Sequence, residues 1–293
     1  MAAQQFERGG VINYMIDLPV RGLFALFALL PHGASLSFAA WFTSRVLAPP
    51  FGVNRRIREN LKRVWPQMPE PEIKRLCREV SENSARLMVE SLNPKEFLHH
   101  AVNASFGGAG KDGLIAALTS ERPIILVSGH FGNYQVLRVL LGQLGRASAS
   151  VYRPMNNAYT NARYIDNMNR IAGPNYPRGM RGTKNLLGHL RKGGTIALLN
   201  DQAAYEGEDL TFMGHPARTM TSTAELALKY TALVFPFYCI RKKNGVDFDV
   251  VVEAPIAHSD PITMTQDLND SLDAMVRKHP GQWFWVHRRW KQY

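Results

Sequence analysis

The feature that most constrains this fold is a strand, a tight turn and a helix joined within one short segment. The apolar run 124–127 leads into the turn SGHFGN at 128–133, and an amphipathic stretch follows over 136–144. Short apolar runs bounded by turn residues are typical of buried strands, and the amphipathic stretch predicts a helix. His130 therefore lies just after the carboxyl end of a strand, where α/β folds place ligands and reactive groups.

Strand and helix signals alternate from about residue 110 to the end of the chain. Residues 52–100 before them read as helices, with Glu82 and Glu90 on a solvated face. This alternation predicts an α/β fold with a mostly parallel central sheet flanked by helices, and an antiparallel piece near the end. The expected helices are 111–120, 135–144, 159–171, 183–190, 222–230 and 268–278; the expected strands are 123–128, 149–153, 195–200, 233–241 and 248–252.

The amino-terminal stretch differs from the rest in composition. Residues 22–30 are nearly all apolar, the sequence Pro-His-Gly interrupts at 31–33, and residues 36–42 are apolar again. A spanning helix needs about 20 consecutive apolar residues, which this stretch reaches only by including the break. An apolar hairpin or an interfacial helix suits it as well, and a signal peptide or a buried core helix are alternatives. We expect residues 1–50 to be a membrane-associated helical segment and 51–293 a single α/β domain.

The chain is basic, with 35 Lys and Arg against 24 Asp and Glu and a formal net charge of +11. Such a surface attracts nucleic acid, anionic membranes or acidic proteins. Nucleic acid is disfavoured, because the sequence lacks an aromatic-and-basic repeat, a zinc-ligand spacing and a long basic tail. The basic run 54–63 follows the apolar segment, so an anionic membrane surface explains it as well as a solvated helix face does. Two distant cysteines, Cys77 and Cys239, indicate a reduced compartment.

Four short motifs fall at strand ends or in loops, where one site could gather them. They are His130 with Gln135, the sequence YRP at 152–154, the sequence NDQ at 200–202 and the carboxy-terminal WFWVHRRW at 283–290. Together and in this order, they resemble the late acyltransferases of lipid A biosynthesis, the lauroyl/myristoyl group. The resemblance covers almost the whole chain and is strongest over 129–134 and 279–289.

The resemblance implies an enzyme on the cytoplasmic face of a Gram-negative inner membrane. It would move a fatty acyl chain from an acyl carrier protein to a hydroxyl of a lipid A precursor, without a metal or another cofactor. A hydroxyl that attacks a thioester must lose its proton, and an imidazole is a suitable base near neutral pH. The resemblance gives this role to His130 and places Arg170 and Asp201 in the same site; for Arg170 an ordinary surface ion pair is an equal alternative.

Substrate binding is expected from a second set of residues. Gly132 and Asn133 lie at the start of a predicted helix, and their backbone N–H groups would stabilise an oxyanion. The remaining members of this set are Tyr152, Arg153, Gln202 and Arg288. A strand-terminating turn at 152–154 and a core role for the carboxy-terminal tryptophans are the alternatives.

Gln135 is the position where this chain departs from the family, which has a carboxylate there to pair with the histidine. Where an amide replaces the carboxylate of a protease triad, the rate falls by roughly 10⁴, or about 5.5 kcal/mol of barrier. We therefore predict a severely impaired enzyme that Gln135→Glu would rescue by orders of magnitude. A carboxylate supplied from elsewhere, an engineered change, another glycolipid or lipid acceptor, and a non-catalytic lipid-binding or carrier-binding protein are the alternatives.

Overall fold

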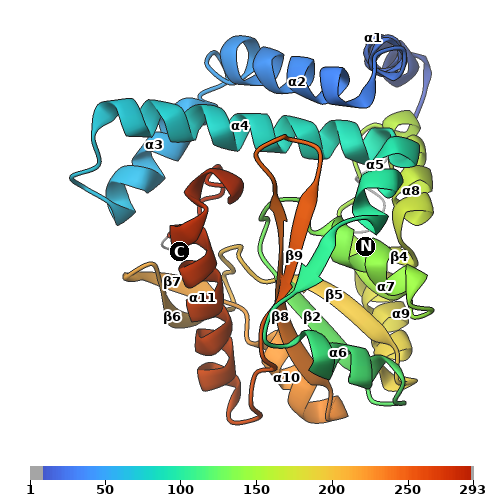
Figure 1. Cartoon of the computed structure of the whole chain (residues 1–293), viewed down its shortest axis with the longest axis vertical. Helices are drawn as coiled ribbons and strands as arrows, with labels where there is room; N and C mark the ends of the chain where they lie inside the picture. The colour runs from blue at the N-terminus through green and yellow to red at the C-terminus, as the bar shows by residue number, and fades with distance from the viewer. Residues whose placement is uncertain (1–8, 292–293) are drawn as a thin grey trace.

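Seven strands form one sheet in the computed structural model, which describes residues 9–291 (Figure 1). All neighbouring strands run parallel except β8 and β9, which form an antiparallel hairpin. The mostly parallel sheet with a late antiparallel piece is therefore confirmed. The strand order is β1 (Ser105–Gly107), β9 (Phe248–Val252), β8 (Leu233–Arg241), β2 (Ile124–Ser128), β5 (Thr195–Leu199), β3 (Ser148–Tyr152) and β4 (Asn175–Pro177).

Helices cover both faces of the sheet, and strand β2 shows why. Ile124 and Leu126 belong to one apolar cluster, whereas Ile125 and Val127 belong to another on the opposite face. Successive side chains of a strand point to opposite faces, so a strand covered on both sides must be apolar throughout. The first face packs against α5 (Pro94–Val102), α6 (Lys111–Leu118) and α7 (Gln135–Gln143), and the second against α9 (Met180–Arg191), α10 (Ser222–Tyr230) and α11 (Pro261–Lys278).

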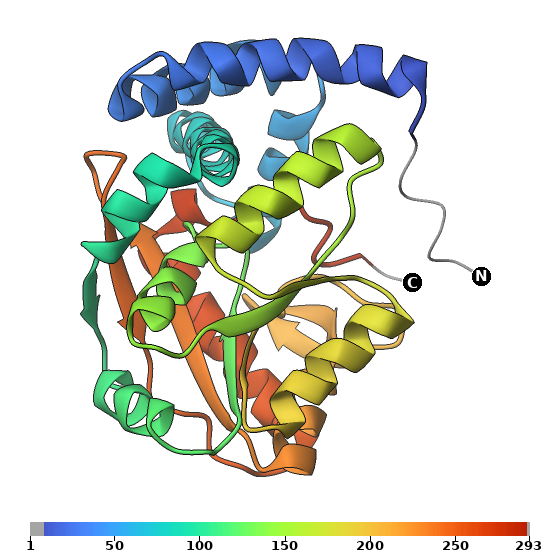
Figure 2. The same cartoon turned by 90° about the vertical axis from the view of Figure 1, so that its right-hand side faces the viewer.

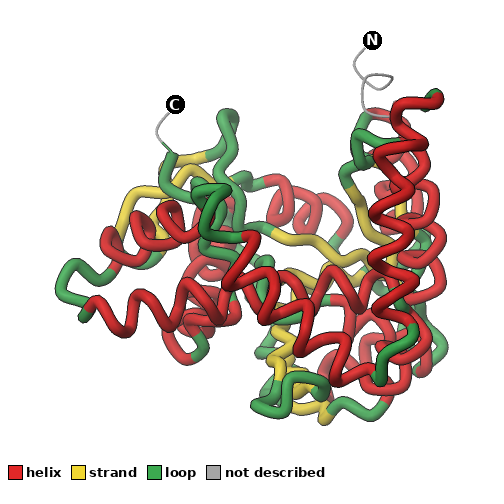
Figure 3. The backbone as a smooth tube through the Cα atoms, turned by 90° about the horizontal axis from the view of Figure 1, so that it is seen from above, coloured by secondary structure: helices red, strands yellow, loops and turns green. Residues whose placement is uncertain are grey.

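The amino-terminal helices form a separate layer beyond the long helix α4, as Figures 1 and 2 show. Seen from above, the helix that follows the amino terminus runs along one side of the molecule (Figure 3). This layer and its support comprise α1 (Val11–Ala28), α2 (His32–Phe42), the π-helical turn η1 (Thr43–Leu47), α3 (Val53–Val64) and α4 (Glu70–Leu92). Within residues 9–291, no helix is both long enough and apolar enough to cross a membrane. Residues 1–8 of the expected membrane-associated segment lie outside the described range.

A buried ion cluster fastens α1 to α8 (Ala158–Ile171). The Asp17 carboxylate is fully buried and accepts hydrogen bonds from both terminal nitrogens of Arg163 at 2.6 Å, from Thr160 at 2.7 Å and from Arg21 at 2.7 Å. These hydrogen bonds, that from Arg163 above all, outweigh burial and hold the pKa of Asp17 far below its usual value. The orientation of α1 on the rest of the molecule is thus fixed by a paired charge.

Several strands and one helix start were not predicted from the sequence. The short edge strands β1 and β4 were missed, as was the hairpin of β6 (Glu208–Phe212) and β7 (His215–Thr219). Its two-residue turn places both Met213 and Gly214 at positive φ, and methionine gives no turn signal there. Helix α11 begins at Pro261 rather than at 268, because Asp260 caps it by accepting two backbone N–H bonds.

Candidate active site

His130 lies in the loop between β2 and α7, and two glycines let this loop pass close to its neighbours. Gly132 has a φ of +53°, and a Cβ there would lie 1.8 Å from the carbonyl oxygen of Cys239. A Cβ at Gly129 would lie 2.9 Å from Leu272 and 3.1 Å from an Asp201 carboxylate oxygen. Any larger residue at either position would push the loop away from its neighbours, so the sequence GHFG sets the place of His130.

Asp201 is the carboxylate partner of His130. Strands β2 and β5 are parallel neighbours in which Ser128 pairs with Leu199, so residues 130 and 201 lie at the same level beyond the two strand ends. The Nδ1 atom of His130 lies 2.7 Å from Oδ1 of Asp201. The other carboxylate oxygen, Oδ2, accepts the backbone N–H of His130 at 2.7 Å and the indole N–H of Trp283 at 2.9 Å. Three donors therefore hold one carboxylate.

This geometry fixes the tautomer of the imidazole. A carboxylate can only accept, so Nδ1 carries the proton and Nε2 keeps a free lone pair. Burial acts to lower the pKa of His130, but the Asp201 carboxylate outweighs it and the net pKa is raised. Burial acts to raise the pKa of Asp201, but the imidazole and its hydrogen bonds hold it well below its usual value. The pair suits a base that is neutral at rest and stabilised once it is protonated.

A second histidine packs against the first. The rings of His130 and His287 are 4.7 Å apart in an edge-to-face arrangement, and Nε2 of His287 lies 3.3 Å from the side-chain nitrogen of Gln202. Burial, with a smaller contribution from His130, lowers the pKa of His287 to about 4. His287 is therefore neutral under ordinary conditions and adds no positive charge beside His130.

A cavity of about 430 Å³ opens beside His130. It extends from the strand ends, at Tyr152 and Leu199, down the sheet to Ser150 and Ala197, which pair two residues earlier in β3 and β5. The buried guanidinium of Arg138 lines it and contacts Ser148 at the start of β3. One wall comprises Tyr134, which precedes α7, together with Arg138 of α7 and Tyr164 and Met168 of α8. Its size is within the range of small-molecule sites.

The structure corrects the interpretation of Gln135 as the partner of His130. The Gln135 side chain is buried, accepts a hydrogen bond from Arg138 at 2.8 Å and directs its amide nitrogen at the sulfur of Met168, also at 2.8 Å. Position 135 is the first residue of α7, and its side chain contacts Arg138 one turn later and Met168 of α8 rather than His130. The reason for expecting an impaired enzyme disappears, because the carboxylate beside His130 comes from Asp201.

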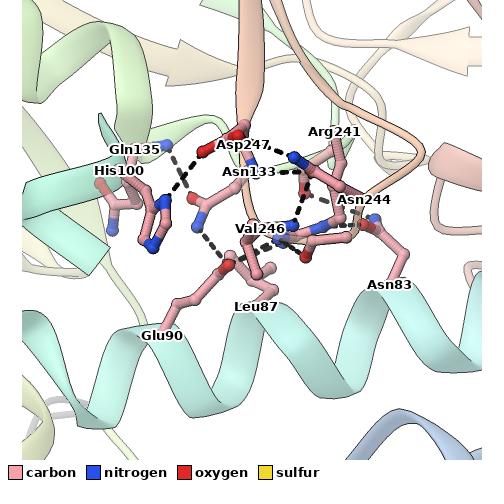
Figure 4. Close-up of polar contacts among 12 residues, drawn as sticks. Asn83, Leu87, Glu90, His100, Asn133, Gln135, Arg241, Asn244, Val246 and Asp247 are labelled. Atoms are coloured by element: carbon pink, nitrogen blue, oxygen red, sulfur yellow. Dashed lines mark hydrogen bonds and ion pairs between the residues drawn. The ribbon is translucent and has the colours of Figure 1, made fainter. Parts of the chain in front are cut away.

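Helix α4 supports the loop between β2 and α7 through the side chain of Glu90 (Figure 4). Glu90 is fully buried, and its carboxylate binds the Arg241 guanidinium through two hydrogen bonds of 2.5 and 2.7 Å and accepts a third, of 2.8 Å, from the Asn133 side chain. Asn133 in turn accepts the backbone N–H of Gln135 at 3.1 Å. The expectation that Glu90 lies on a solvated face was wrong, because its partner Arg241 is 151 residues away in sequence.

Several of the predicted site residues surround the cavity and others do not. Tyr152, Arg153 and Gln202 line it together with His130. The backbone N–H of Gly132 donates to the carbonyl of Gln282 at 2.9 Å, and that of Asn133 donates to the carbonyl of Cys239 at 3.3 Å. The expectation that these two groups stabilise an oxyanion was therefore wrong, because the chain already uses both donors.

The two remaining predicted arginines point elsewhere. The Arg170 side chain is 66% exposed and pairs with Asp166 one turn earlier in α8, at 3.0 Å. Arg288 is exposed, and neither arginine lines the cavity. The surface-pair alternative thus describes Arg170. The cavity residues that sequence reasoning missed include Tyr134, Arg138, Tyr164, Met168 and Arg178. For α8, the signal was available in the spacing of Tyr164 and Met168, which places them on one helix face.

Comparison with known proteins places this chain in an enzyme family. The family model for "bacterial lipid A biosynthesis acyltransferase" matches residues 8–292. The lipid A biosynthesis palmitoleoyltransferase of Escherichia coli K12 is 23% identical over 252 residues, which cover 84% of this chain and 81% of the relative. The same figures hold for the lipid A biosynthesis acyltransferase of Shigella flexneri.

Among solved structures, the 1-acyl-sn-glycerophosphate (LPA) acyltransferase PlsC of Thermotoga maritima aligns with a TM-score of 0.38 and 12% identity, over 85% of this chain and 96% of that one. The match to the family model extends over nearly the whole chain, including both strand ends that form the His130–Asp201 pair. This chain belongs to the bacterial lipid A biosynthesis acyltransferase family and is an acyltransferase.

Proposed function

We propose that the enzyme transfers a fatty acyl chain from acyl carrier protein to a hydroxyl of a lipid A precursor, with His130 as the general base and Asp201 as its partner. The observation that carries the proposal is the 2.7 Å contact between Nδ1 of His130 and the buried Asp201 carboxylate. It directs the lone pair of Nε2 away from Asp201, and His130 lines the cavity that would hold the substrate.

In the proposed reaction, Nε2 of His130 takes the proton of the acceptor hydroxyl as its oxygen attacks the thioester carbonyl. A tetrahedral oxyanion forms, and its collapse breaks the carbon–sulfur bond. The imidazolium then returns its proton to the departing thiolate, so the base is regenerated. Asp201 stabilises the imidazolium between these two steps, as the carboxylate does in a catalytic triad.

We assign oxyanion stabilisation to the phenol of Tyr134. Its ring lies 6.1 Å from the His130 ring and lines the same cavity. Burial raises the pKa of Tyr134 far above its usual value, so the hydroxyl keeps its proton and can donate. One such donor typically contributes 10²–10³ to the rate.

The cavity beside His130 would hold the fatty acyl chain, as the name of the E. coli relative suggests for its own substrate. Arg153 and Arg178 at its edge would attract a phosphate of the acceptor or of the carrier arm. We expect an active enzyme, because Asp201 provides the carboxylate that position 135 lacks.

We further propose that residues 1–50 dock on the cytoplasmic face of the inner membrane and that residues 51–293 form the acyltransferase domain. Large apolar side chains are exposed along the amino-terminal layer: Val11 75%, Ile12 75%, Met15 63%, Leu29 82%, Trp41 48% and Phe51 79%. Large exposed apolar side chains gathered on one layer are typical of an interfacial membrane contact. The basic residues of α3 follow directly and would bind anionic lipid headgroups.

The test is transfer from a myristoyl-loaded acyl carrier protein to a lipid A precursor, with lysophosphatidic acid as the competing acceptor. We expect transfer to the lipid A precursor by the unaltered chain and a loss on the order of 10²–10⁴ in His130→Gln. The matched control is His99→Gln, since His99 is an exposed histidine of α5 that does not line the cavity. Transfer to lysophosphatidic acid alone, or full activity in His130→Gln, would refute the proposal.

A further inference from the structure

The surface around α9 has an unusual charge distribution. Between Asp166 and Asp201 the sequence contains no Asp or Glu, but it contains six Lys and Arg residues. Five of them, on α9 and at its two ends, are exposed and lie more than 4.0 Å from every described carboxylate: Arg178, Arg181, Lys184, Arg191 and Lys192.

Several exposed arginines elsewhere are paired with acidic residues of their own helices. On α4, Arg75 pairs with Glu72 and Glu79, and on α11, Arg277 pairs with Asp273. Such i,i+3 and i,i+4 pairs are the ordinary way to balance an exposed helix. Helix α9 contains no acidic residue, so its own side chains do not balance its positive charge. That charge is available to attract a negatively charged partner.

A groove of about 490 Å³ runs along the same helix. The buried residues of α9 are Gly182, Leu186 and Leu190, which face the core. The groove uses another side of the helix and includes Met180, which is 89% exposed, together with Leu187 and Tyr230 from α10. Apolar side chains flanked by unpaired cations on one helix face suit an amphipathic partner helix of negative charge.

The position of α9 links this surface to the catalytic cavity and separates it from the membrane layer. The backbone N–H of Arg178 donates to the carbonyl of Tyr152 at 2.7 Å, and both residues line the cavity. Helix α9 begins two residues later. Figures 1 and 2 show α1 and α2 at one end of the molecule and α9 toward the opposite end. The basic surface therefore lies on a part of the molecule remote from the apolar layer.

We propose that α9 is the docking surface for the acidic carrier protein that presents the acyl thioester. The inference rests on the proposed acyl transfer and adds the place where the donor binds. A negatively charged carrier helix lies in the groove along α9, and its acyl arm enters the cavity past Arg178. The acceptor lipid approaches from the side of the α1–α2 layer, so the two substrates reach His130 from different directions.

The experiment compares the full chain with the double variant Arg181→Glu/Lys184→Glu and with a control, Lys74→Glu/Arg78→Glu. The control changes the net charge by the same amount on exposed residues of α4. Two quantities are measured at low salt: binding of myristoyl-loaded acyl carrier protein, and kcat/KM with that donor relative to kcat/KM with myristoyl-pantetheine, which has no protein to dock. In the α9 variant, we expect both carrier binding and this ratio to fall on the order of tenfold or more. The control keeps both values of the unaltered chain.

Carrier binding equal in the α9 variant and in the unaltered chain would overturn the proposal, and so would an equal loss with both donors, which indicates a damaged cavity. Loss of binding to anionic vesicles with intact carrier binding would assign the surface to lipid instead. If no donor supports transfer in the unaltered chain, the proposed function fails, but carrier binding still decides whether α9 is the docking surface.

Discussion

Replacing Asp201 by asparagine is the sharpest test of the site, because the structure predicts how the amide will sit. Two fixed N–H groups, the His130 backbone and the Trp283 indole, point at Oδ2, whereas only the rotatable imidazole points at Oδ1. The amide oxygen will therefore occupy the Oδ2 position, and the NH₂ group will face Nδ1 of His130. The imidazole must then accept at Nδ1 and hold its proton on Nε2, which is the wrong tautomer for a base.

The expected loss is large. An amide that enforces the wrong tautomer in a protease triad lowers kcat by roughly 10⁴, which corresponds to about 5.5 kcal/mol of barrier. We expect a loss of that order in single-turnover acyl transfer by Asp201→Asn. The control is Asp209→Asn, because Asp209 is a carboxylate of β6 that is 73% exposed and pairs with Arg218. Thermal unfolding of each variant separates lost chemistry from a lost fold.

The pH dependence gives a second readout of the same pair. The base must be neutral, and the net pKa of His130 is raised, so transfer by the unaltered chain should decline on the acid side from a pH above about 6.5. In Asp201→Asn the carboxylate no longer stabilises the imidazolium and burial remains, so this acid limb should move to lower pH. Transfer within tenfold of the unaltered chain, with an unmoved acid limb, would refute the assignment of Asp201.

Three further predictions concern other parts of the molecule. Gln135→Glu should change acyl transfer by less than about tenfold and raise the free energy of unfolding by about 1–2 kcal/mol, because it places a carboxylate against the buried Arg138; a hundredfold gain in transfer would restore the motif interpretation. Tyr134→Phe should lower kcat by about 10²–10³ in the same assay, with KM nearly constant. Asp17→Asn should cost about 3 kcal/mol in the attachment of α1, measured by hydrogen exchange in that helix, because it leaves Arg163 without its charge partner. The pKa of Asp17 is lowered by folding, so this stabilisation is complete above about pH 4 and is lost as the pH falls toward the folded pKa.

Local sequence patterns were sufficient to predict most of the helices and strands. The apolar runs of β2, β5 and β8 are continuous and bounded by turn residues, so their buried positions followed from hydrophobic pattern alone. The edge strands β1 and β4 have three residues each, too few to show a period. They pair with β9 and β3 through contacts that only the assembled sheet provides.

The same division explains the site. The sequence placed His130 and Asp201 at separate strand ends, but the family motif favoured a partner five residues away, at Gln135. That interpretation was wrong because Gln135 is the first residue of α7 and its side chain is buried between α7 and α8. It contacts Arg138 and Met168 there. The pairing of His130 with Asp201 instead requires that β2 and β5 be neighbours, although α7, β3, α8, β4 and α9 separate them in the chain.

Strand order therefore determines the chemistry here. In a parallel sheet, the residue two positions beyond each of two paired strand ends is held at one level, and only the right neighbour brings a carboxylate to an imidazole. Glu90 follows the same logic, since it binds Arg241 across 151 residues and supports the loop through Asn133. Both carboxylates are fully buried, so each would be unfavourable without its distant partner. The site consequently forms only when the central sheet is complete, and unfolding β5 should abolish the base and the fold together.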